Sequence, residues 1–459
     1  MKHDQAQAET AEVVVGRALA KGHAGQHTRG RTQSRAALSP ALDPVRQAAR
    51  DRAIRLTALW HHVYASDRLR EAYDSLHHDA APGVDGQTWA AYGEPLETTR
   101  RDVSDRLTRG TDQASPVTRV DIPQADDRQR PLGKPTLEDK IVQRAPVEVL
   151  NALAEEELLG FSYGARPERS PHQGLDAVTV GIEKRHSNGG RDADIWGFFG
   201  AIDPEWLVKC VEHRMGDQRV VRHIHTWRNA GVREDGPWRH QEEGTPQGGR
   251  PSPWLAHLYL HDGGDLWAAQ WRRRHARGDV MIVRSGDDVI AGCQPTDAAE
   301  PCLRDLRERC RTFTLERHPD QTRLVECGRD AVERRPRRGQ GTPETVDVFG
   351  LTHMCGQTTR GVLTGRRKTI ATGLRRKLRA VTQTLRQRLH WPIQELGAWL
   401  KRVVGGHDRY DGVPRHMGMR RVLRERILRD WCRTIRRRSQ RHRMTWQRMY
   451  HLLARQRVE

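Results

Sequence analysis

Long apolar runs are absent from this sequence of 459 residues. No stretch of eighteen or more apolar residues occurs, and the N-terminus lacks the apolar core of a signal peptide. Both absences argue against a membrane-spanning helix and against secretion, so we expect a cytoplasmic protein with no membrane partner. Apolar residues make up only 36% of the chain, but Trp and Leu recur at regular spacings, and we expect most of it to fold.

Cysteine is also scarce. The seven cysteines are scattered, odd in number, and never form a C-x2-C pair that is followed by another such pair. We therefore expect neither a structural zinc site nor a disulfide framework. Isolated, reduced thiols are the simplest interpretation.

Acidic residues are depleted from the C-terminal part of the chain. From Gly365 to Glu459 there are 27 Arg or Lys against six Asp or Glu, a net charge of +21, whereas the preceding part has 52 basic and 53 acidic residues. A solvated face rarely concentrates charge in this way, so the block predicts a dedicated polyanion-binding element. Nucleic acid is the expected partner, with an affinity that falls steeply as salt rises.

The order of patterns along the chain predicts an α+β protein with two or three subdomains. Residues 1–44 lack periodicity and are interpreted as a flexible leader, and one or two helices are expected over 45–76. Further strands and helices then alternate. Strands are predicted at Asp192–Phe199, Val280–Arg284 and Val289–Cys293, and helices at Pro204–Arg214 and Ala298–Thr314.

Beyond Gly365 the pattern becomes all-helical. Apolar residues at three- and four-residue steps predict one helix over 370–389, a second that begins at Ile393 and ends at Gly405-Gly406, and a third over 419–435. Arginines occupy the remaining faces. The apolar stripes are interpreted as core, which leaves the arginines to meet a ligand.

The most distinctive local feature is a predicted hairpin with an acidic tip. Two apolar runs flank a turn that carries Asp287 and Asp288. Taken alone, this pattern favours an ordinary solvated turn. A third carboxylate, Asp194, lies in an apolar strand that a sheet could place beside the hairpin. Three such carboxylates can hold two Mg2+ ions, which activate a primer 3′-hydroxyl and clamp nucleotide phosphates.

Several ordered blocks give the chain a resemblance to a known family. The spacing of the three aspartates is similar to that in the polymerase palm of reverse transcriptases, and from about Ala81 onward the chain resembles group II intron maturases. The blocks that carry this resemblance are Ala81–Gly86, Arg130–Gly133, Pro135–Ala145, Phe161–Gly164 and, most diagnostic, Gly244–Gly249 followed by Ser252-Pro253.

The resemblance implies a right-hand polymerase fold, with fingers and palm over 45–336 and an all-helical, basic thumb and maturase region over 337–459. It implies an RNA-directed DNA polymerase that uses two Mg2+ ions and also binds group II intron RNA to assist its splicing and mobility. The implied partners are this intron RNA, an RNA template with a DNA primer, and deoxynucleotides. No Cys/His endonuclease module follows Glu459, so we expect no DNA cleavage by this chain.

The resemblance also assigns roles at the centre of the site. Asp194 and Asp287 would be the principal metal ligands, with Asp288 completing the catalytic acidic cluster. Such a cluster suits the oxygen-preferring Mg2+ ion.

Three further residues are implied to bind the nucleotide. Phe199 matches an aromatic residue that crowds the 2′ position of the sugar and favours deoxynucleotides, although an ordinary core aromatic explains it equally well without the family. Gln247 would line the nucleotide pocket. Arg130 would approach the triphosphate, because a guanidinium pairs well with phosphate oxygens.

The basic helices match the region that grips template-primer and intron RNA in this family. A solvated helix face remains the alternative for any one of their cations. The candidate nucleic-acid-binding residues are Arg375, Arg376, Lys377, Arg436, Arg437 and Arg438.

Several positions near the chemistry depart from the family pattern. Ser285-Gly286 stands where the family has Tyr-Ala, and Gln124 and Gln321 stand where basic residues are usual. Gly200 replaces an aspartate and Ala165 an aromatic residue. Two rival hypotheses follow, namely a catalytically weak or inactive RNA-binding splicing factor and a decayed gene copy whose product folds poorly. Thermal melting of the purified protein tests the second rival.

Overall fold

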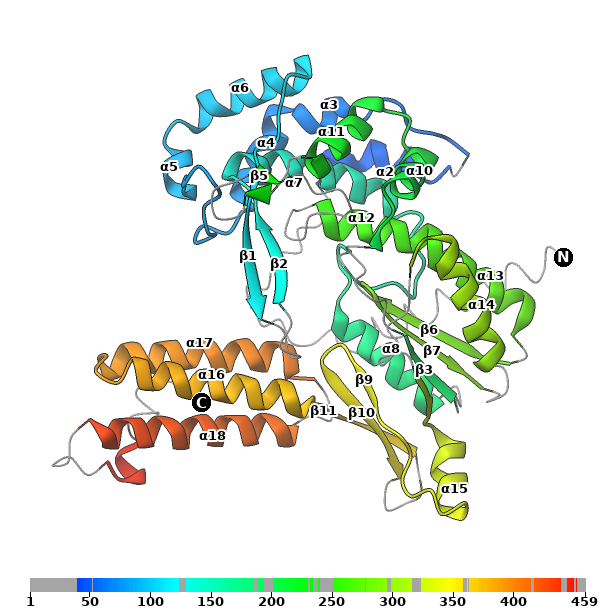
Figure 1. Ribbon diagram of the computed structural model, residues 1–459, viewed down its shortest axis with the longest axis vertical. Coiled ribbons are helices and arrows are strands. Elements are labelled where there is room, and N and C mark those ends of the chain that lie inside the picture. Colours follow the sequence, from blue (N-terminus) through cyan, green and yellow to red (C-terminus); the bar gives the residue numbers. More distant parts are fainter. Residues whose placement is uncertain are drawn as a thin grey trace. The chain divides into compact units, whose positions relative to one another are not determined.

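A computed structural model gives the fold of the chain (Figure 1). By their contacts the residues form two units, Met1–Val178 with Arg191–Leu324, and Thr179–Gly190 with Val325–Glu459. The predicted boundary after residue 336 stays a prediction. The structure describes residues 39–51, 53–123, 129–164, 166–184, 189–193, 201–229, 232–233, 238–239, 251–276, 278–294, 299–315, 323–357, 361, 363–413, 417–438, 444–449 and 451.

The N-terminal helices of the first unit pack around one apolar core. At the centre of this core is α7, in which twelve of eighteen residues are buried. Trp60 is fully buried beside it, and its indole N–H donates to the carbonyl of Leu107 at 3.0 Å. These helices are η1 (Pro40–Leu42), α2 (Asp43–Ala49), α3 (Trp60–Tyr64), α4 (Ser66–Asp74), α5 (Trp89–Gly93), α6 (Leu96–Arg109) and α7 (Leu137–Ala154).

A small sheet has the strand order β2-β1-β4-β5, and its strands β1 and β2 lie between α6 and α7 in the chain. Its main feature is the antiparallel pair β1 and β2, in which Thr118 lies opposite Lys134 and Ile122 opposite Arg130. The strands are β1 (Val117–Pro123), β2 (Gln129–Lys134), β4 (Val232–Arg233) and β5 (Trp238–Arg239).

A second four-stranded sheet, of order β6-β7-β3-β8, carries the predicted hairpin. Side chains of α13, including Trp271, pack on the hairpin residues Val280 and Ile282, and Figure 1 shows β6, β7 and β3 side by side. The strands are β6 (Val280–Ser285), β7 (Asp288–Cys293), β3 (Gly189–Ala193) and β8 (Arg323–Glu326). Helix α8 (Pro171–Lys184) precedes them in the chain. The helices between them in sequence are α10 (Pro204–Arg214), α11 (Gln218–Asn229), α12 (Pro251–Leu260), the π-helical turn η2 (His261–Asp265), α13 (Leu266–His275) and α14 (Ala299–Thr312).

Most elements predicted for this part of the chain are confirmed. The two hairpin strands are present, and α10 has the predicted bounds because Asp203 caps it, accepting hydrogen bonds from the backbone of Glu205 and Trp206. The α+β composition is also confirmed. Of the strand predicted at 192–199, only residues 192 and 193 are described, and they end β3, which spans Gly189–Ala193.

The second unit contains a sheet that the sequence did not predict. Helix α15 (Arg329–Arg337) precedes three antiparallel strands, β9 (Val346–Val348), β10 (Leu351–Gln357) and β11 (Leu363–Thr369). The prediction of an all-helical region from residue 337, and of helix directly beyond Gly365, is therefore wrong up to residue 369.

The physical reason is that polar residues occupy interior positions of this sheet. His353 and Arg367 lie opposite each other in the β10–β11 ladder and both are buried. Burial lowers the pKa of His353 to about 3, so its ring is neutral, and Arg367 donates to the Thr179 hydroxyl at 2.6 Å. Because polar residues occupy these buried positions, the sequence lacks the alternation of apolar and polar residues that would predict a strand.

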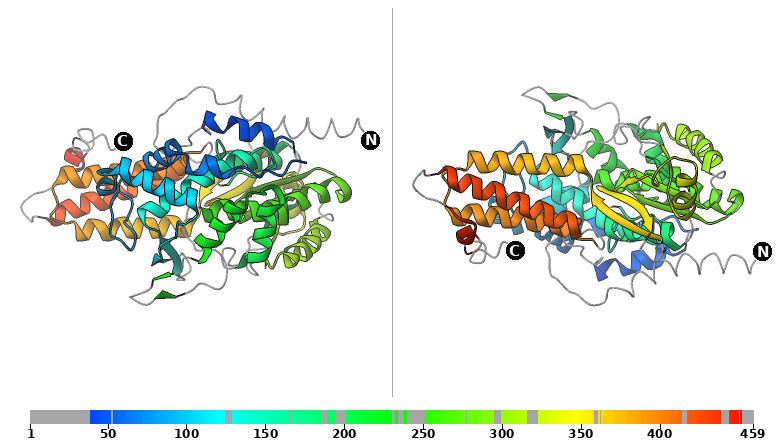
Figure 2. Two further views of the ribbon diagram at one scale, coloured as in Figure 1. Left: turned by 90° about the horizontal axis from the view of Figure 1, so that it is seen from above. Right: turned by 90° about the horizontal axis from the view of Figure 1, so that it is seen from below.

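Three long helices complete the second unit. They are α16 (Ala371–Gln387), α17 (Ile393–Asp411) and α18 (Met417–Arg437), and both views of Figure 2 show them packed side by side. Helix α17 does not end at Gly405-Gly406 as predicted, because Val404, His407 and Asp411 continue its buried stripe to the last turn. Among the described residues, no helix is long and apolar enough to cross a membrane.

A cluster of buried carboxylates in the first unit makes its stability depend on pH. Burial raises the pKa of Asp139 to about 6, although Thr136 and Ser115 donate hydrogen bonds to its carboxylate. Burial also raises the pKa of the nearby Asp112 to about 6, against the opposing charge of Arg106. Because each native pKa lies above the usual value of 3.8, each group favours the folded state at low pH.

We expect Asp139→Asn to flatten this pH dependence. The stabilising contribution of Asp139 is complete below about pH 4 and is lost as the pH rises through about 6. As the pH rises between those limits, the unfolding free energy of the variant should increase by roughly 1–3 kcal/mol relative to that of the wild type. Chemical unfolding at several pH values measures this, with the exposed Asp79→Asn as control. Parallel curves for wild type and Asp139→Asn would contradict the assignment.

Candidate active site

The acidic tip lies on a tight antiparallel hairpin. Ser285 pairs with Asp288, which leaves Gly286 and Asp287 as a two-residue turn. Gly286 has a φ of +69°, and it is the only one of the two with a positive φ, which is the pattern of a type II′ turn. Glycine adopts this conformation without strain, so Gly286 suits the turn. Asp288 is exposed and Asp287 is half-buried.

The Phe161–Gly164 segment supports this hairpin along β6. The backbone N–H of Arg284 donates to the Phe161 carbonyl at 2.9 Å, and that of Tyr163 donates to the Arg284 carbonyl at 2.8 Å. Gly164 then passes so close to the turn that a Cβ at this position would collide with the backbone nitrogen of Gly286. One of the blocks that carries the family resemblance thus forms the backing of the acidic turn.

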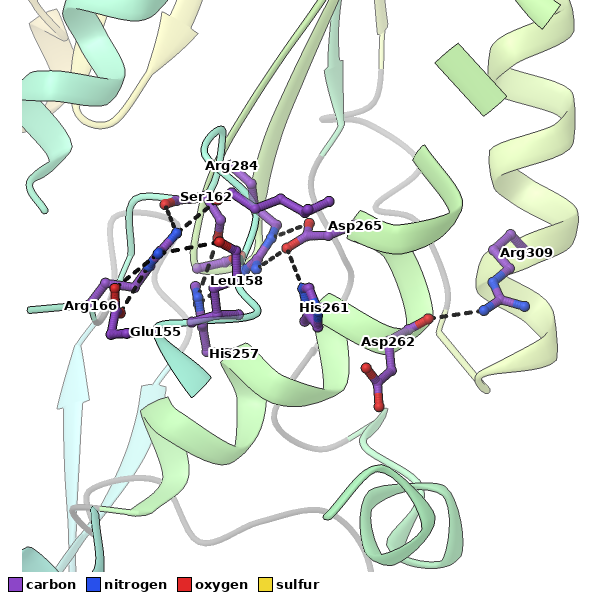
Figure 3. A network of polar contacts seen from close by, with 12 residues as sticks. Glu155, Leu158, Ser162, Arg166, His257, His261, Asp262, Asp265, Arg284 and Arg309 are labelled. Carbon is purple, nitrogen blue, oxygen red and sulfur yellow. Dashed lines mark hydrogen bonds and ion pairs between the residues drawn. The ribbon is translucent and has the colours of Figure 1, made fainter. Parts of the chain in front are cut away.

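A fully buried ion pair lies behind the same turn (Figure 3). Arg284 donates from Nε to Asp265 Oδ1 at 2.7 Å and from Nη2 to Oδ2 at 2.5 Å. Its Nη1 donates to the carbonyl of Gly286 at 3.1 Å. Although burial raises it, the pKa of Asp265 is held at about 2 by the Arg284 guanidinium, so the carboxylate is ionised. The pair therefore joins η2 to the hairpin tip.

His257 extends this network in its neutral form. Burial, together with the Arg284 guanidinium, lowers the pKa of His257 to about 2. Its Nδ1 lies 3.3 Å from Arg284 Nη1, which can only donate, and its Nε2 lies 3.3 Å from the Ser162 hydroxyl. We therefore assign the ring proton to Nε2, which donates to Ser162.

A second buried arginine fixes the other end of the supporting segment. Arg166 makes a two-pronged ion pair with Glu155, at 2.9 Å for both contacts, and donates from Nη1 to the carbonyls of Leu159 and Ser162. Figure 3 shows Arg166 and Glu155 on one side of Ser162 and the Arg284 pair on the other. The backing of the hairpin is thus held by two buried guanidinium groups.

Comparison with known proteins decides the family. The model of the family "Reverse transcriptase (RNA-dependent DNA polymerase)" matches residues 122–353. The chain belongs to the reverse transcriptase family. The hairpin whose surroundings are drawn in Figure 3 lies inside the segment that the family model matches.

Individual relatives agree with this family and with the predicted resemblance to group II intron proteins. The chain is 28% identical to protein YkfC of Escherichia coli (strain K12) over 298 residues, which cover 56% of this chain and 78% of YkfC. It is 30% identical to the group II intron-encoded protein LtrA of Lactococcus lactis subsp. cremoris over 210 residues, 45% of this chain. The match spans only 34% of LtrA.

Several predicted site residues of this reverse transcriptase-family chain lie outside the described residues. They are Asp194, Phe199 and Gln247, together with the variant positions 124, 165, 200 and 321. Arg130 lies in β2, but only its backbone is described. Within the described ranges, no group of three or more His, Cys, Asp or Glu side chains is arranged to hold a metal. The structure therefore describes Asp287 and Asp288 at the hairpin tip, and all the predicted site roles stay proposals.

The predicted nucleic-acid-binding residues of the reverse transcriptase-family chain fall on two helices. Arg375 and Arg376 are exposed on α16, whereas Lys377 is half-buried. Burial lowers the pKa of Lys377, and the carboxylates of Asp411 and Asp408 partly offset this effect. Arg375 and Arg376 are therefore better placed than Lys377 to meet a phosphate.

The second cluster of arginines lies at the C-terminal end of α18. Arg436 and Arg437 are exposed, and Arg436 Nε donates to the carbonyl of Met444 at 2.8 Å. Arg438 is half-buried, and burial lowers its pKa. Two of the three guanidinium groups are thus available to solvent.

No role is predicted from the sequence for Arg284, Asp265 or His257. A signal was present for His257 and Arg284, because each is a polar residue within or at the end of an apolar run, and such a residue is buried only when it is paired. What the sequence could not give was the pairing, since Asp265 and Arg284 come from different elements.

Proposed function

We propose that the chain is an RNA-directed DNA polymerase that also binds group II intron RNA and assists its splicing and mobility. The observation that carries the first part is the rigidly backed hairpin of a reverse transcriptase-family chain, with Asp287 and Asp288 at its tip. Carboxylates at an exposed tip, rather than in a closed cluster, leave room for a primer end and a nucleotide.

The donor chemistry at the tip fits Mg2+. Asp287 and Asp288 offer carboxylate oxygens, which are the ligands that Mg2+ prefers, and Asp194 is proposed as the third. When bound there, the ions would lower the pKa of the primer 3′-hydroxyl and offset charge on the leaving pyrophosphate. Asp287 and Asp288 can contribute to such a metal site only if the turn that carries them is held in place.

The nucleotide and RNA contacts are proposed from the resemblance. Arg130 and Gln247 would bind the deoxynucleotide, and Phe199 would exclude a 2′-hydroxyl. The exposed arginines of α16 and α18 would contact phosphates of the template-primer and of the intron RNA.

The two activities can be measured on one preparation of the full chain. We expect dTTP incorporation on poly(rA) primed with oligo(dT) in the presence of Mg2+, with UTP incorporated far more slowly. We also expect faster splicing of a group II intron RNA when the protein is present. A folded preparation that incorporates no dTTP would overturn the polymerase proposal.

The exposed arginines of α16 provide a test of RNA binding. We expect the double variant Arg375→Gln/Arg376→Gln to bind structured RNA about tenfold more weakly at low salt. Because two phosphate contacts are lost, the slope of log affinity against log salt should shrink by about 1.5. The matched control replaces two exposed arginines of the first unit, Arg70→Gln/Arg304→Gln, and should bind like the wild type.

The second candidate is an RNA-binding splicing factor without polymerase activity. Ser285, Gln124 and Gln321 favour it, since each lacks a group that family members use near the chemistry. This candidate expects RNA binding and splicing assistance to survive in the absence of any nucleotide incorporation, which the assays above would reveal.

A further inference from the structure

The hairpin turn has no bulky side chain of its own to brace it. The tip reads Ser285-Gly286-Asp287-Asp288, so the residue before the aspartates is glycine and the one before that is small. A turn of this composition would be loose in isolation, because glycine restricts the backbone least. Whatever holds Asp287 in a fixed direction must therefore come from outside the turn.

Arg284 is placed to supply this brace. Three of its donor atoms are used, two on Asp265 and one, Nη1, on the carbonyl of Gly286. The Gly286 carbonyl belongs to the peptide group that leads into Asp287, so this hydrogen bond fixes the plane of that peptide. The direction of the Asp287 side chain follows from the direction of its backbone.

The other end of the brace is equally fixed. Asp265 is the last residue of η2, a π-helical turn between α12 and α13, and it is almost completely buried. Such π-helical turns are rare in proteins, and those that do occur are often found at functional sites. His257, less than three turns earlier along the same run of helix, contacts Nη1 of Arg284. The guanidinium is thus held by helical elements on one side and holds the turn on the other.

Stability alone is a weak reason for such an arrangement. Removing two charges from water costs much of what their attraction returns, and apolar residues of similar volume often stabilise a core equally well. A buried pair that also makes a hydrogen bond to a functional turn is better explained by positioning.

We propose that the Arg284–Asp265 pair is a positioning device that sets the geometry of the Gly286-Asp287 turn and thereby the affinity of the tip for divalent metal. The inference rests on the proposed function, in which Asp287 is a metal ligand. Arg284 and Asp265 touch neither metal nor substrate in this account. They act through the peptide group of the turn.

The test uses the full chain and two readouts that need no substrate. Hydrogen–deuterium exchange of a peptide covering 281–292 reports the mobility of the turn, and electron paramagnetic resonance with Mn2+ alone reports metal affinity. In Arg284→Lys, which keeps the charge but loses the fork, we expect exchange at the tip to rise and the Mn2+ dissociation constant to increase about tenfold or more, as for other groups that orient metal ligands. The Mg2+ concentration needed for primer extension should rise in parallel.

A matched control is available in Arg214. It is a buried arginine that pairs with Glu157 and donates to backbone carbonyls of Ala49 and Ile54, away from the hairpin. Arg214→Lys should leave tip exchange and Mn2+ affinity at wild-type values. The second test variant is Asp265→Asn, which keeps the shape of the side chain and one acceptor oxygen. It decides the question if Arg284→Lys does not fold.

The outcomes separate this inference from the proposed function. If the folded test variant shows wild-type exchange at the tip and wild-type Mn2+ affinity, the positioning role is overturned even when the wild type is an active polymerase. If the wild type extends no primer but the variants loosen the tip and weaken Mn2+ binding, the polymerase proposal fails and the positioning role stands.

Discussion

Replacing Asp287 by Asn is expected to lower RNA-templated DNA synthesis by about a hundredfold or more while leaving the fold intact. The substitution keeps the size of the side chain and removes the charge that would hold Mg2+ against the primer end. Because Asp287 is only half-buried at the tip of the turn, its removal disturbs no core packing. Single-turnover primer extension on an RNA template measures the effect.

The same hairpin offers a matched control for this variant. Asp279 is exposed just before β6, at the opposite end of the hairpin, where its backbone pairs with that of Gln294. Asp279→Asn changes the net charge by the same amount and should retain wild-type extension. Equal activity of the Asp287→Asn and wild-type chains would show that Asp287 is not a ligand of the catalytic metal.

The largest effect on stability is expected for Asp265→Leu. The change leaves the guanidinium of Arg284 buried without its carboxylate, and such an unpaired charge costs about 3–5 kcal/mol. Native-state hydrogen exchange of the α12 amides measures the unfolding free energy of this part of the chain without assuming that both units unfold together.

A double variant separates the two roles of the pair. In Arg284→Met/Asp265→Leu neither charge of this pair remains, so most of the lost stability should return. The hydrogen bond to the Gly286 carbonyl is still missing, so the turn should stay loose and extension should stay impaired. Recovery of both stability and extension would mean that the pair serves packing alone.

The hairpin was predictable because two apolar strands and a Gly-Asp turn are a local pattern. The end of α17 was not, since two glycines normally mark a helix terminus. Here the helix continues because His407 and Asp411 lie one turn apart on its buried face, with His407 Nδ1 at 2.5 Å from Asp411 Oδ2. The packing of the bundle outweighs the local preference of Gly405-Gly406.

Long-range pairing explains what the sequence could not provide at the site. Phe161–Gly164 was recognisable as a family block, but its role as the backing of the turn depends on hydrogen bonds to Arg284, more than a hundred residues away. The pairing of Arg284 with Asp265 likewise joins two segments whose patterns are unrelated. The same limit applies to β10 and β11, whose buried His353 and Arg367 resemble surface residues until the sheet is seen.

We propose above that this hairpin catalyses DNA synthesis on RNA. The most direct measurement is primer extension by the wild-type chain and by Asp287→Asn, prepared identically and both shown to be folded and to bind RNA. The account predicts a Mg2+-dependent DNA product from the wild type that is lost in the variant. No product from a folded, RNA-binding wild-type chain would contradict it and would favour the splicing-factor function instead.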